Sequence, residues 1–370
     1  MNKIVWPSWL TDKLGQPTPA FRSYWNFIQE RHRIYLARLA GKVAPWTEDE
    51  ILRGYKFTNT FRVLDRESQT CVRIANSSNR SSEEAFFRIL LFKIFNLTST
   101  WELLCGELGE EPLLSNWDPN QYAEILTTAR ERNRKIFSSA YMLWADQREG
   151  SVRGSGSKTR MWLNTLDKML RDNVPGSIVS ANTYEHAIKV LSGYDGIQDF
   201  TAQQYATDFS YTDWFQPTDS ETFILPGPGS IDGIAKCFGR VFDKEDCLII
   251  IEVMRLSGAE LSQVATGQEP PTLKGFGIDR TMDLIDYQSA FCEVDKYSRI
   301  AHPELNYLSK QKREKIKATY SANPGEVRPL PRPVFPSRWW TVAEKARKED
   351  ESREETVSYH ENSPHVACGA

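Results

Sequence analysis

Apolar residues recur along the chain mainly at the spacing of α-helices. In the segment 162–170, WLNTLDKML, they fall three and four positions apart, which places them on one side of a helix. The segment 85–95, AFFRILLFKIF, is apolar nearly all round, which predicts a buried central helix. Alternation of apolar and polar residues, the pattern of a half-buried strand, is scarce. The chain is therefore predicted to be all-α with irregular connections.

Several helix starts are indicated by capping residues. Thr47 and Ser81 are each followed three residues later by a glutamate, the pattern of a capping box. Asp118 precedes a proline, which fits the cap and first position of a helix, and Thr183 precedes another apolar repeat. Apolar positions from Met282 to Cys292 predict a long late helix.

Composition divides the chain into three parts. Residues 1–20 form an N-terminal extension, and residues 21–320 carry the helical pattern. Residues 321–370 contain a proline-rich stretch and then a nearly all-charged run, EKARKEDESREE, so they are predicted to form a disordered tail. Within that tail, Trp339 and Trp340 are the candidates for docking on the body.

Charge and cysteine usage limit the classes of function. The net charge of −3 excludes a strongly cationic nucleic-acid coat, although it leaves room for a local basic surface. The six cysteines have neither zinc-ligand nor disulfide-framework spacing, so no metal site is predicted. Reduced thiols and the lack of a signal peptide predict an intracellular protein, nuclear or cytoplasmic. No apolar run is long enough for a membrane span.

The segment 193–219 resembles the helix-hairpin-helix of DNA glycosylases. Gly196 fits the turn between two helices, where backbone N–H groups can bind a phosphate. Asp219 follows at the distance of that superfamily's catalytic aspartate, which would face an extruded base. Gln198 replaces the second glycine of the turn, which weakens the approach of a phosphate. The alternative interpretation is a tight turn between packed helices, with a solvated aspartate.

A glycine-rich segment, ILPGPGSIDGIAKCFG, spans residues 224–239. Gly227 and Gly229 lie at a predicted helix start, Ser230 is a candidate N-cap, and Lys236 lies on the following helix. This arrangement suits a phosphate or nucleotide contact. A proline- and glycine-rich connector explains the same residues.

Two clusters of charged residues are further candidates. Asn59, Arg62 and Arg66 fall on one face of a predicted helix, which suits either a phosphate site or a surface ion-pair ladder. Asp279, Asp283 and Asp286 share another face, where carboxylates could hold Mg²⁺ or form solvated salt bridges. The segment 150–159, GSVRGSGSKT, lacks the second glycine of a phosphate-loop motif and is not preceded by an apolar strand.

Four segments together resemble the helical domain of the 5-hydroxymethyluracil DNA kinases, also called α-glutamyl/putrescinyl thymine pyrophosphorylases. They occur in the same order between about Phe21 and Ile300 and read PWTEDEILRGYKFTNTFRVLDRESQ, FRILLFKIFN, DGIQDFTAQQYATD with GPGSIDG, and AFCEVDKYSR. The resemblance implies DNA as partner and a transferase activity on a thymine-derived base, with ATP and Mg²⁺ as implied cofactors. It also implies site roles for Asn59, Arg62, Asp65, Arg66, Gln204, Asp208, Gly227, Gly229, Glu293, Asp295 and Lys296.

These observations combine into one hypothesis for the mechanism. The hairpin and the arginines hold phosphates of DNA or of a nucleotide, and a modified base is flipped into an aromatic pocket. Asp65, Asp208 or Glu293 then orients the hydroxymethyl group or acts as base. The alternatives are a non-catalytic DNA-binding module, a glycosylase-like enzyme using Asp219, and a nucleotide or metabolite enzyme unrelated to DNA.

Overall fold

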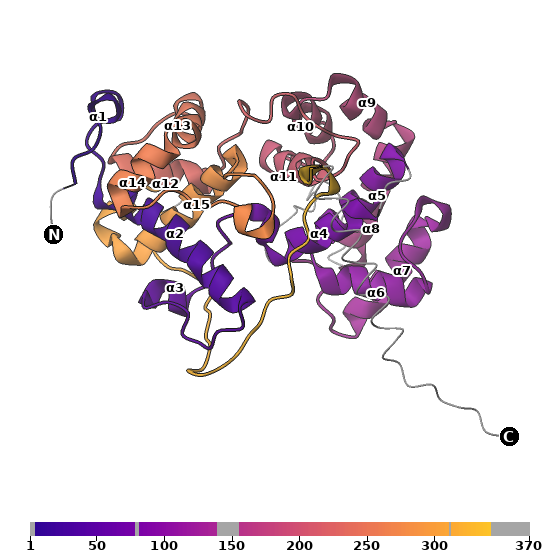
Figure 1. Cartoon of the computed structure of the whole chain (residues 1–370). Helices are drawn as coiled ribbons and strands as arrows, with labels where there is room; N and C mark the ends of the chain where they lie inside the picture. Colours follow the sequence, from indigo (N-terminus) through magenta and orange to yellow (C-terminus); the bar gives the residue numbers. More distant parts are fainter. Residues whose placement is uncertain (1–3, 78–80, 139–154, 311, 342–370) are drawn as a thin grey trace.

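The computed structural model describes residues 4–77, 81–138, 155–310 and 312–341, and the fold within these ranges is helical. The α-helices are joined by short 3₁₀ turns and irregular connections (Figure 1). Across the same ranges, β-pairing is limited to two isolated bridges, Val43 with Val327 and Tyr55 with Thr319. The predicted all-α class is confirmed. None of the helices in the described ranges is both long and apolar enough to cross a membrane.

The helix bounds follow chain order. The α-helices are α1 Ser8–Leu14, α2 Pro19–Leu39, α3 Glu50–Gly54, α4 Arg66–Asn76, α5 Ser82–Phe95, α6 Thr98–Leu108, α7 Pro119–Glu131, α8 Ser155–Arg171, α9 Val174–Ala181, α10 Tyr184–Ser192, α11 Asp199–Phe209, α12 Pro228–Phe238, α13 Lys244–Leu256, α14 Gly258–Thr266 and α15 Leu284–Ala301. The 3₁₀ turns are η1 Arg62–Leu64, η2 Leu114–Asn116, η3 Lys274–Phe276, η4 Pro303–Leu308 and η5 Ser337–Trp339.

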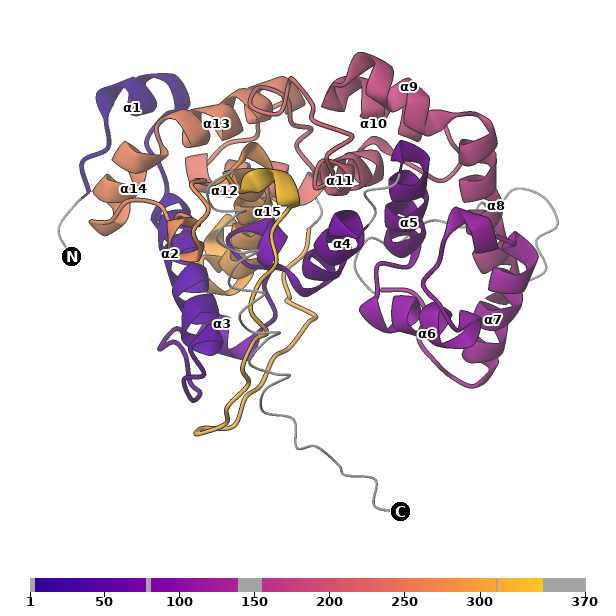
Figure 2. The same cartoon turned by 45° about the vertical axis from the view of Figure 1, so that its right-hand side comes forward.

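The helices form two groups that lie side by side in both views (Figures 1 and 2). In one group, the early helix α2 packs against the late helices α12, α14 and α15. In the other, α5 is central and contacts α4, α6, α8, α9 and α11. The chain thus leaves the first group after α3 and returns to it with α12. The turn η1 joins the groups, since it contacts both α4 and α15.

The apolar segment 85–95 occupies the middle of the second group, as predicted. Its residues in α5 are all buried, including Phe86 and Phe87, which are fully inaccessible. Phe86 stacks on Phe209 of α11, with ring centroids 5.0 Å apart. A helix that is apolar on all sides is stable only when other helices surround it.

Most predicted helix caps are confirmed. Ser81, Asp118 and Thr183 each accept a backbone N–H from the first turn of the helix that follows. The predicted cap at Thr47 is wrong, because Asp49 accepts the N–H groups that open α3. Thr47 instead accepts the backbone N–H of Asp49 and donates to Glu30.

Part of the segment predicted to be disordered packs against the body. Phe335 is only 2% exposed, although it lies between prolines in a sequence with few apolar residues. The Gln69 side chain of α4 exchanges two hydrogen bonds with the backbone of Val334, at 2.8 and 3.0 Å. The expectation of disorder from residue 321 onward therefore needs correction up to Thr341, and residues 342–370 lie outside the described residues.

Two truncations should separate these parts of the tail. Ending the chain at Thr341 removes residues 342–370, which include the nearly all-charged run EKARKEDESREE, and should leave the melting temperature within a few degrees. Ending it at Tyr320 also removes Phe335, and loss of such a buried ring costs about 3–5 kcal/mol. Phe335→Ala in the full chain should reproduce most of that loss in urea denaturation. Equal stability of the two truncated proteins would contradict the packing role of this segment.

Candidate functional site

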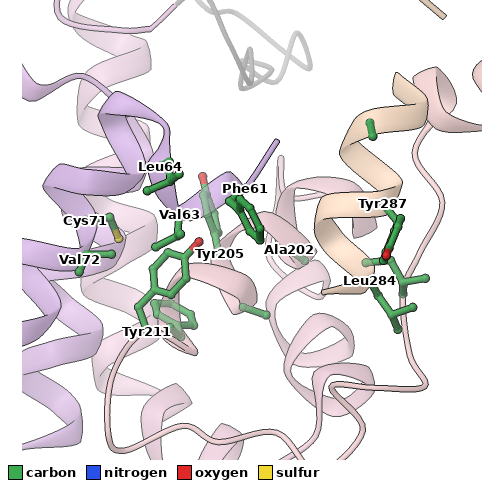
Figure 3. Packing of buried hydrophobic residues seen from close by; sticks show 14 of the residues in the cluster. Phe61, Val63, Leu64, Cys71, Val72, Ala202, Tyr205, Tyr211, Leu284 and Tyr287 are labelled. Atoms are coloured by element: carbon green, nitrogen blue, oxygen red, sulfur yellow. The ribbon is translucent and has the colours of Figure 1, made fainter. Parts of the chain in front are cut away.

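A cleft of about 480 Å³ lies where the two groups of helices meet. Its walls come from segments that are far apart in sequence: residues 61–63 at η1, the hairpin helices α10 and α11, residues 279–286 before and within α15, and Arg338 with Trp339 at η5. Figure 3 shows buried apolar side chains of this region, among them Phe61, Val63 and Tyr211, together with Leu284 and Tyr287 of α15. The cleft is therefore a product of the tertiary fold.

A network of buried charged residues lies behind Arg62, which is part of the cleft lining. The Arg62 guanidinium donates to Asp208 Oδ1 at 2.8 Å and to Gln204 Oε1 at 2.7 Å. Lys93 Nζ of α5 lies 2.8 Å from Asp208 Oδ2. Asp208 is wholly buried, and Arg62 is 5% exposed. Buried charges require such pairing, so this network fixes η1, α5 and α11 to one another.

Two carboxylates at the start of α15, Asp283 and Asp286, also line the cleft. Asp286 accepts the backbone N–H of Arg62 at 2.8 Å and that of Asp283 at 3.0 Å. Asp283 caps α15 and pairs with Arg280. Burial, followed by repulsion from Asp283, raises the pKa of Asp286 to about 7. A carboxyl group with this pKa can exchange a proton near neutral pH.

The raised pKa of Asp286 predicts a pH-dependent stability. This carboxyl group loses its proton near pH 3.8 in the unfolded chain but only near pH 7 in the folded one. The folded state therefore holds the extra proton between these values, and the free energy of unfolding falls as the pH rises through that window. Asp286→Asn has no carboxyl group to titrate here. As the pH rises, the parent should therefore lose up to a few kcal/mol in free energy of unfolding relative to this variant. Urea denaturation at about pH 5 and pH 8 measures it; an unchanged difference would refute the assignment.

Three arginines and several aromatic rings complete the lining. Arg280 donates to Asp283 at 2.9 Å, and its guanidinium lies 4.4 Å from the centroid of the Trp339 ring. Arg338 donates to the backbone oxygen of Ser210. The third is Arg255, 3.5 Å from Glu221. Sequence analysis missed all three arginines, since no local motif marks them.

The residues 59–66 do not form the single helix that their spacing predicts. Asp65 has an extended backbone, which separates η1 from α4, so Arg62 and Arg66 do not share a helical face. Asp65 accepts the backbone N–H of Asn59 at 2.8 Å, and burial raises its pKa to about 6. The Arg66 side chain is 80% exposed and pairs with Glu67. Asp65 therefore shapes a turn that lies outside the cleft lining.

The candidates on α15 and α12 also take part in contacts within the fold. Glu293 pairs with Lys296 at 2.6 Å and accepts the backbone N–H of Thr58 at 3.3 Å. Lys236 is fully buried and lies 2.9 Å from Asp295. The Lys236–Asp295 pair joins α12 to α15, and the Glu293–Lys296 pair lies within α15. None of these residues is part of the cleft lining.

The glycine-rich segment is placed by helix packing. Gly227 is the N-cap of α12, which corrects the prediction for Ser230; the Ser230 hydroxyl donates to the Gly227 carbonyl oxygen at 2.8 Å. A Cβ on Gly229 would lie 2.4 Å from Cys292 Sγ on α15. The small residues therefore allow α12 and α15 to approach closely.

The predicted hairpin consists of α10 and α11, joined by a turn in which Gly196 has a φ of 81°. A left-handed conformation of this kind favours glycine. Both carboxylate oxygens of Asp219 accept backbone N–H groups at the start of α10, from Tyr184 at 2.7 Å and from Glu185 at 3.1 Å. Asp219 therefore stabilises the start of a helix.

The structure brings together only part of the predicted site. Arg62 lines the cleft, with Gln204 and Asp208 bonded directly behind it. Asp65, Asp219 and Glu293 are not among the residues that line this cleft. In the described parts of the chain, no three His, Cys, Asp or Glu side chains are grouped as metal ligands would be.

Two comparisons with known proteins give matches that cover most of the chain. Residues 18–307 match a family model described as the helical domain of 5-hmdU DNA kinase. A 5-hmdU DNA kinase of Bacillus phage SP10 is 24% identical over an alignment of 313 residues, and the alignment covers 80% of this chain and 47% of that relative. The chain thus spans about half the length of that relative. No solved structure matches it.

Proposed function

Because the chain belongs to the 5-hmdU DNA kinase helical-domain family, we propose that it binds DNA containing 5-hydroxymethyldeoxyuridine and holds the modified base for phosphorylation. The observation that supports this most is the cleft between the two groups of helices. Its volume of about 480 Å³ suits a nucleotide-sized ligand. Enzymes that modify a DNA base extrude it into such a pocket, where aromatic and polar groups recognise it.

The lining offers a distinct contact for each part of a flipped nucleotide. Tyr184, Tyr211 and Trp339 supply aromatic surface for the base, and Arg280 supplies a cation for the adjoining phosphate. Asp283 is 44% exposed, so its carboxylate can accept a hydrogen bond from the hydroxymethyl group. A thymine methyl group cannot donate that bond, which gives a physical basis for discrimination.

Asp286 is the proposed proton acceptor for the hydroxymethyl oxygen. Its pKa of about 7 makes it a stronger base than an ordinary carboxylate while leaving it partly ionised at neutral pH. The family implies a nucleoside triphosphate with Mg²⁺. The cleft arginines suit phosphate groups, but the described residues include no matching set of metal ligands. We therefore propose DNA binding, base orientation and proton acceptance as the roles of this chain.

The three alternative functions lead to different expectations for this chain. A glycosylase-like reaction would need the Asp219 carboxylate, which accepts two N–H groups at the start of α10 and, unlike Asp286, is not part of the cleft lining. A non-catalytic DNA-binding module would bind DNA without itself modifying the base, whether residue 286 is Asp or Asn. A nucleotide or metabolite enzyme unrelated to DNA would show no affinity for an oligonucleotide.

Fluorescence anisotropy with labelled DNA tests the proposal. Oligonucleotides with one 5-hydroxymethyldeoxyuridine or one thymidine at the same position are compared from about 50 mM salt upward. The modified DNA should bind more tightly, and both affinities should fall with salt as counterions are released. Asp283→Asn, which still suits a helix N-cap, should reduce the discrimination, whereas the exposed Asp12→Asn should not. Equal affinity of the parent protein for both oligonucleotides, or no affinity for either, would overturn the proposal.

A further inference from the structure

The C-terminal segment delivers an arginine to the cleft from outside the region that matches the family. The match ends at residue 307, whereas Arg338 and Trp339 line the cleft thirty residues later. We propose that Arg338 is an anion-binding residue that holds a phosphate group of the ligand in this cleft. The inference deepens the proposed function and rests on it for the identity of the site.

The position of Arg338 is fixed by specific contacts of the preceding residues. Gln69 of α4 bonds both to the backbone N–H and to the carbonyl oxygen of Val334. Asn76 of α4 donates to the carbonyl oxygen of Phe335 at 2.9 Å and accepts the backbone N–H of Ser337 at 3.1 Å. Two amide side chains on one helix thus hold the backbone immediately before Arg338.

The Arg338 guanidinium donates hydrogen bonds to a backbone oxygen, but its positive charge is not balanced by an ion pair. Its Nε and one terminal nitrogen both donate to the backbone oxygen of Ser210, at 2.8 and 2.5 Å, at the C-terminus of α11. Among the described residues, Arg338 has no carboxylate within ion-pair distance, and the nearby Asp213 accepts a hydrogen bond from Ser337 instead. The other N–H donors of the guanidinium remain for a ligand.

A second guanidinium, that of Arg280, lies near Arg338. Burial lowers the pKa of Arg338, and the neighbouring Arg280 lowers it further by charge repulsion. Asp283 balances Arg280, and Trp339 covers one face of the Arg280 side chain. Of the four arginines that line the cleft, Arg62, Arg255 and Arg280 each pair with a carboxylate, whereas Arg338 forms no ion pair among the described residues. An anionic ligand would balance the charge of Arg338. The planar fork of arginine suits a phosphate group, whether it belongs to a DNA strand or to a nucleoside triphosphate.

Binding measurements on the full chain distinguish these sources. The probes are inorganic phosphate, ATP, and the oligonucleotide with 5-hydroxymethyldeoxyuridine, and each is titrated by calorimetry. Arg338→Gln should weaken binding of at least one phosphate probe by about tenfold or more, the loss of one charge-assisted contact. Arg332→Gln is the matched control, because Arg332 is an exposed arginine of the same segment.

The pattern of loss identifies the ligand. A loss restricted to the oligonucleotide assigns Arg338 to the strand, and a loss restricted to ATP assigns it to a triphosphate. Arg338→Lys keeps the charge without the fork, so it should show an intermediate loss even where Arg338→Gln fails to fold. Arg338 variants that bind every probe like Arg332→Gln, or a parent protein that binds none, would overturn the inference. The proposed function fails separately, when the parent protein does not distinguish modified from unmodified DNA.

Discussion

Replacing Arg62 with alanine should lower the free energy of unfolding by about 3–5 kcal/mol, the cost of breaking a buried ion pair. The change removes the guanidinium N–H groups that donate to Asp208 at 2.8 Å and to Gln204 at 2.7 Å. Asp208 is wholly buried and would keep only Lys93 to balance its charge. The loss follows from an uncompensated buried carboxylate, and urea denaturation at neutral pH measures it.

Arg66→Ala is the matched control. Arg66 stands only four residues further along, yet its side chain is 80% exposed, so its loss should change stability by at most about 0.5 kcal/mol. Arg62→Lys should fall between the two, because lysine retains the charge but not the planar geometry that contacts two acceptors. Equal stabilities of Arg62→Ala and Arg66→Ala would mean that the buried network contributes little.

The expected loss of stability on Arg62→Ala is the opposite of what the spacing of the residues alone suggests. With Asn59, Arg62 and Arg66 on one helical face, an exposed phosphate site or ion-pair ladder would leave stability almost unchanged on Arg62→Ala. The distinction depends on Asp208, which lies 146 positions further along the chain. Partners at such separation leave no periodic signal, so sequence analysis found the residues of the network but not their burial.

Local features were predictable because a few adjacent residues determine them. Ser81 and Thr183 cap helices by bonding to backbone groups within one turn, and the apolar run in α5 needs no particular partner to require burial. Phe335 shows the limit of this reasoning. Its segment has the composition of a disordered tail, and its ordering depends on Gln69 and Asn76 of α4. The cleft arginines were missed for the same reason.

Gly233→Ala should destabilise the protein by more than about 3 kcal/mol, the upper part of the range for overpacking a core. A Cβ at this position would lie 2.0 Å from the carbonyl oxygen of Phe291 and 2.7 Å from its carbonyl carbon. These are backbone atoms of α15, so no side-chain rotation can relieve the clash. The helices α12 and α15 would have to separate, which would strain the pairing of Lys236 with Asp295.

Two further glycine substitutions calibrate this result in thermal and urea denaturation. Gly106→Ala, in α6 with no atom within 4 Å of the added Cβ, should stabilise the protein by up to about 1 kcal/mol, because alanine favours a helix over glycine. Gly229→Ala should cost less than Gly233→Ala, because the Cβ meets the Cys292 side chain, which can move. If Gly233→Ala folds as stably as Gly106→Ala but loses phosphate binding, the glycines of this segment serve a ligand, and the packing explanation for them is wrong.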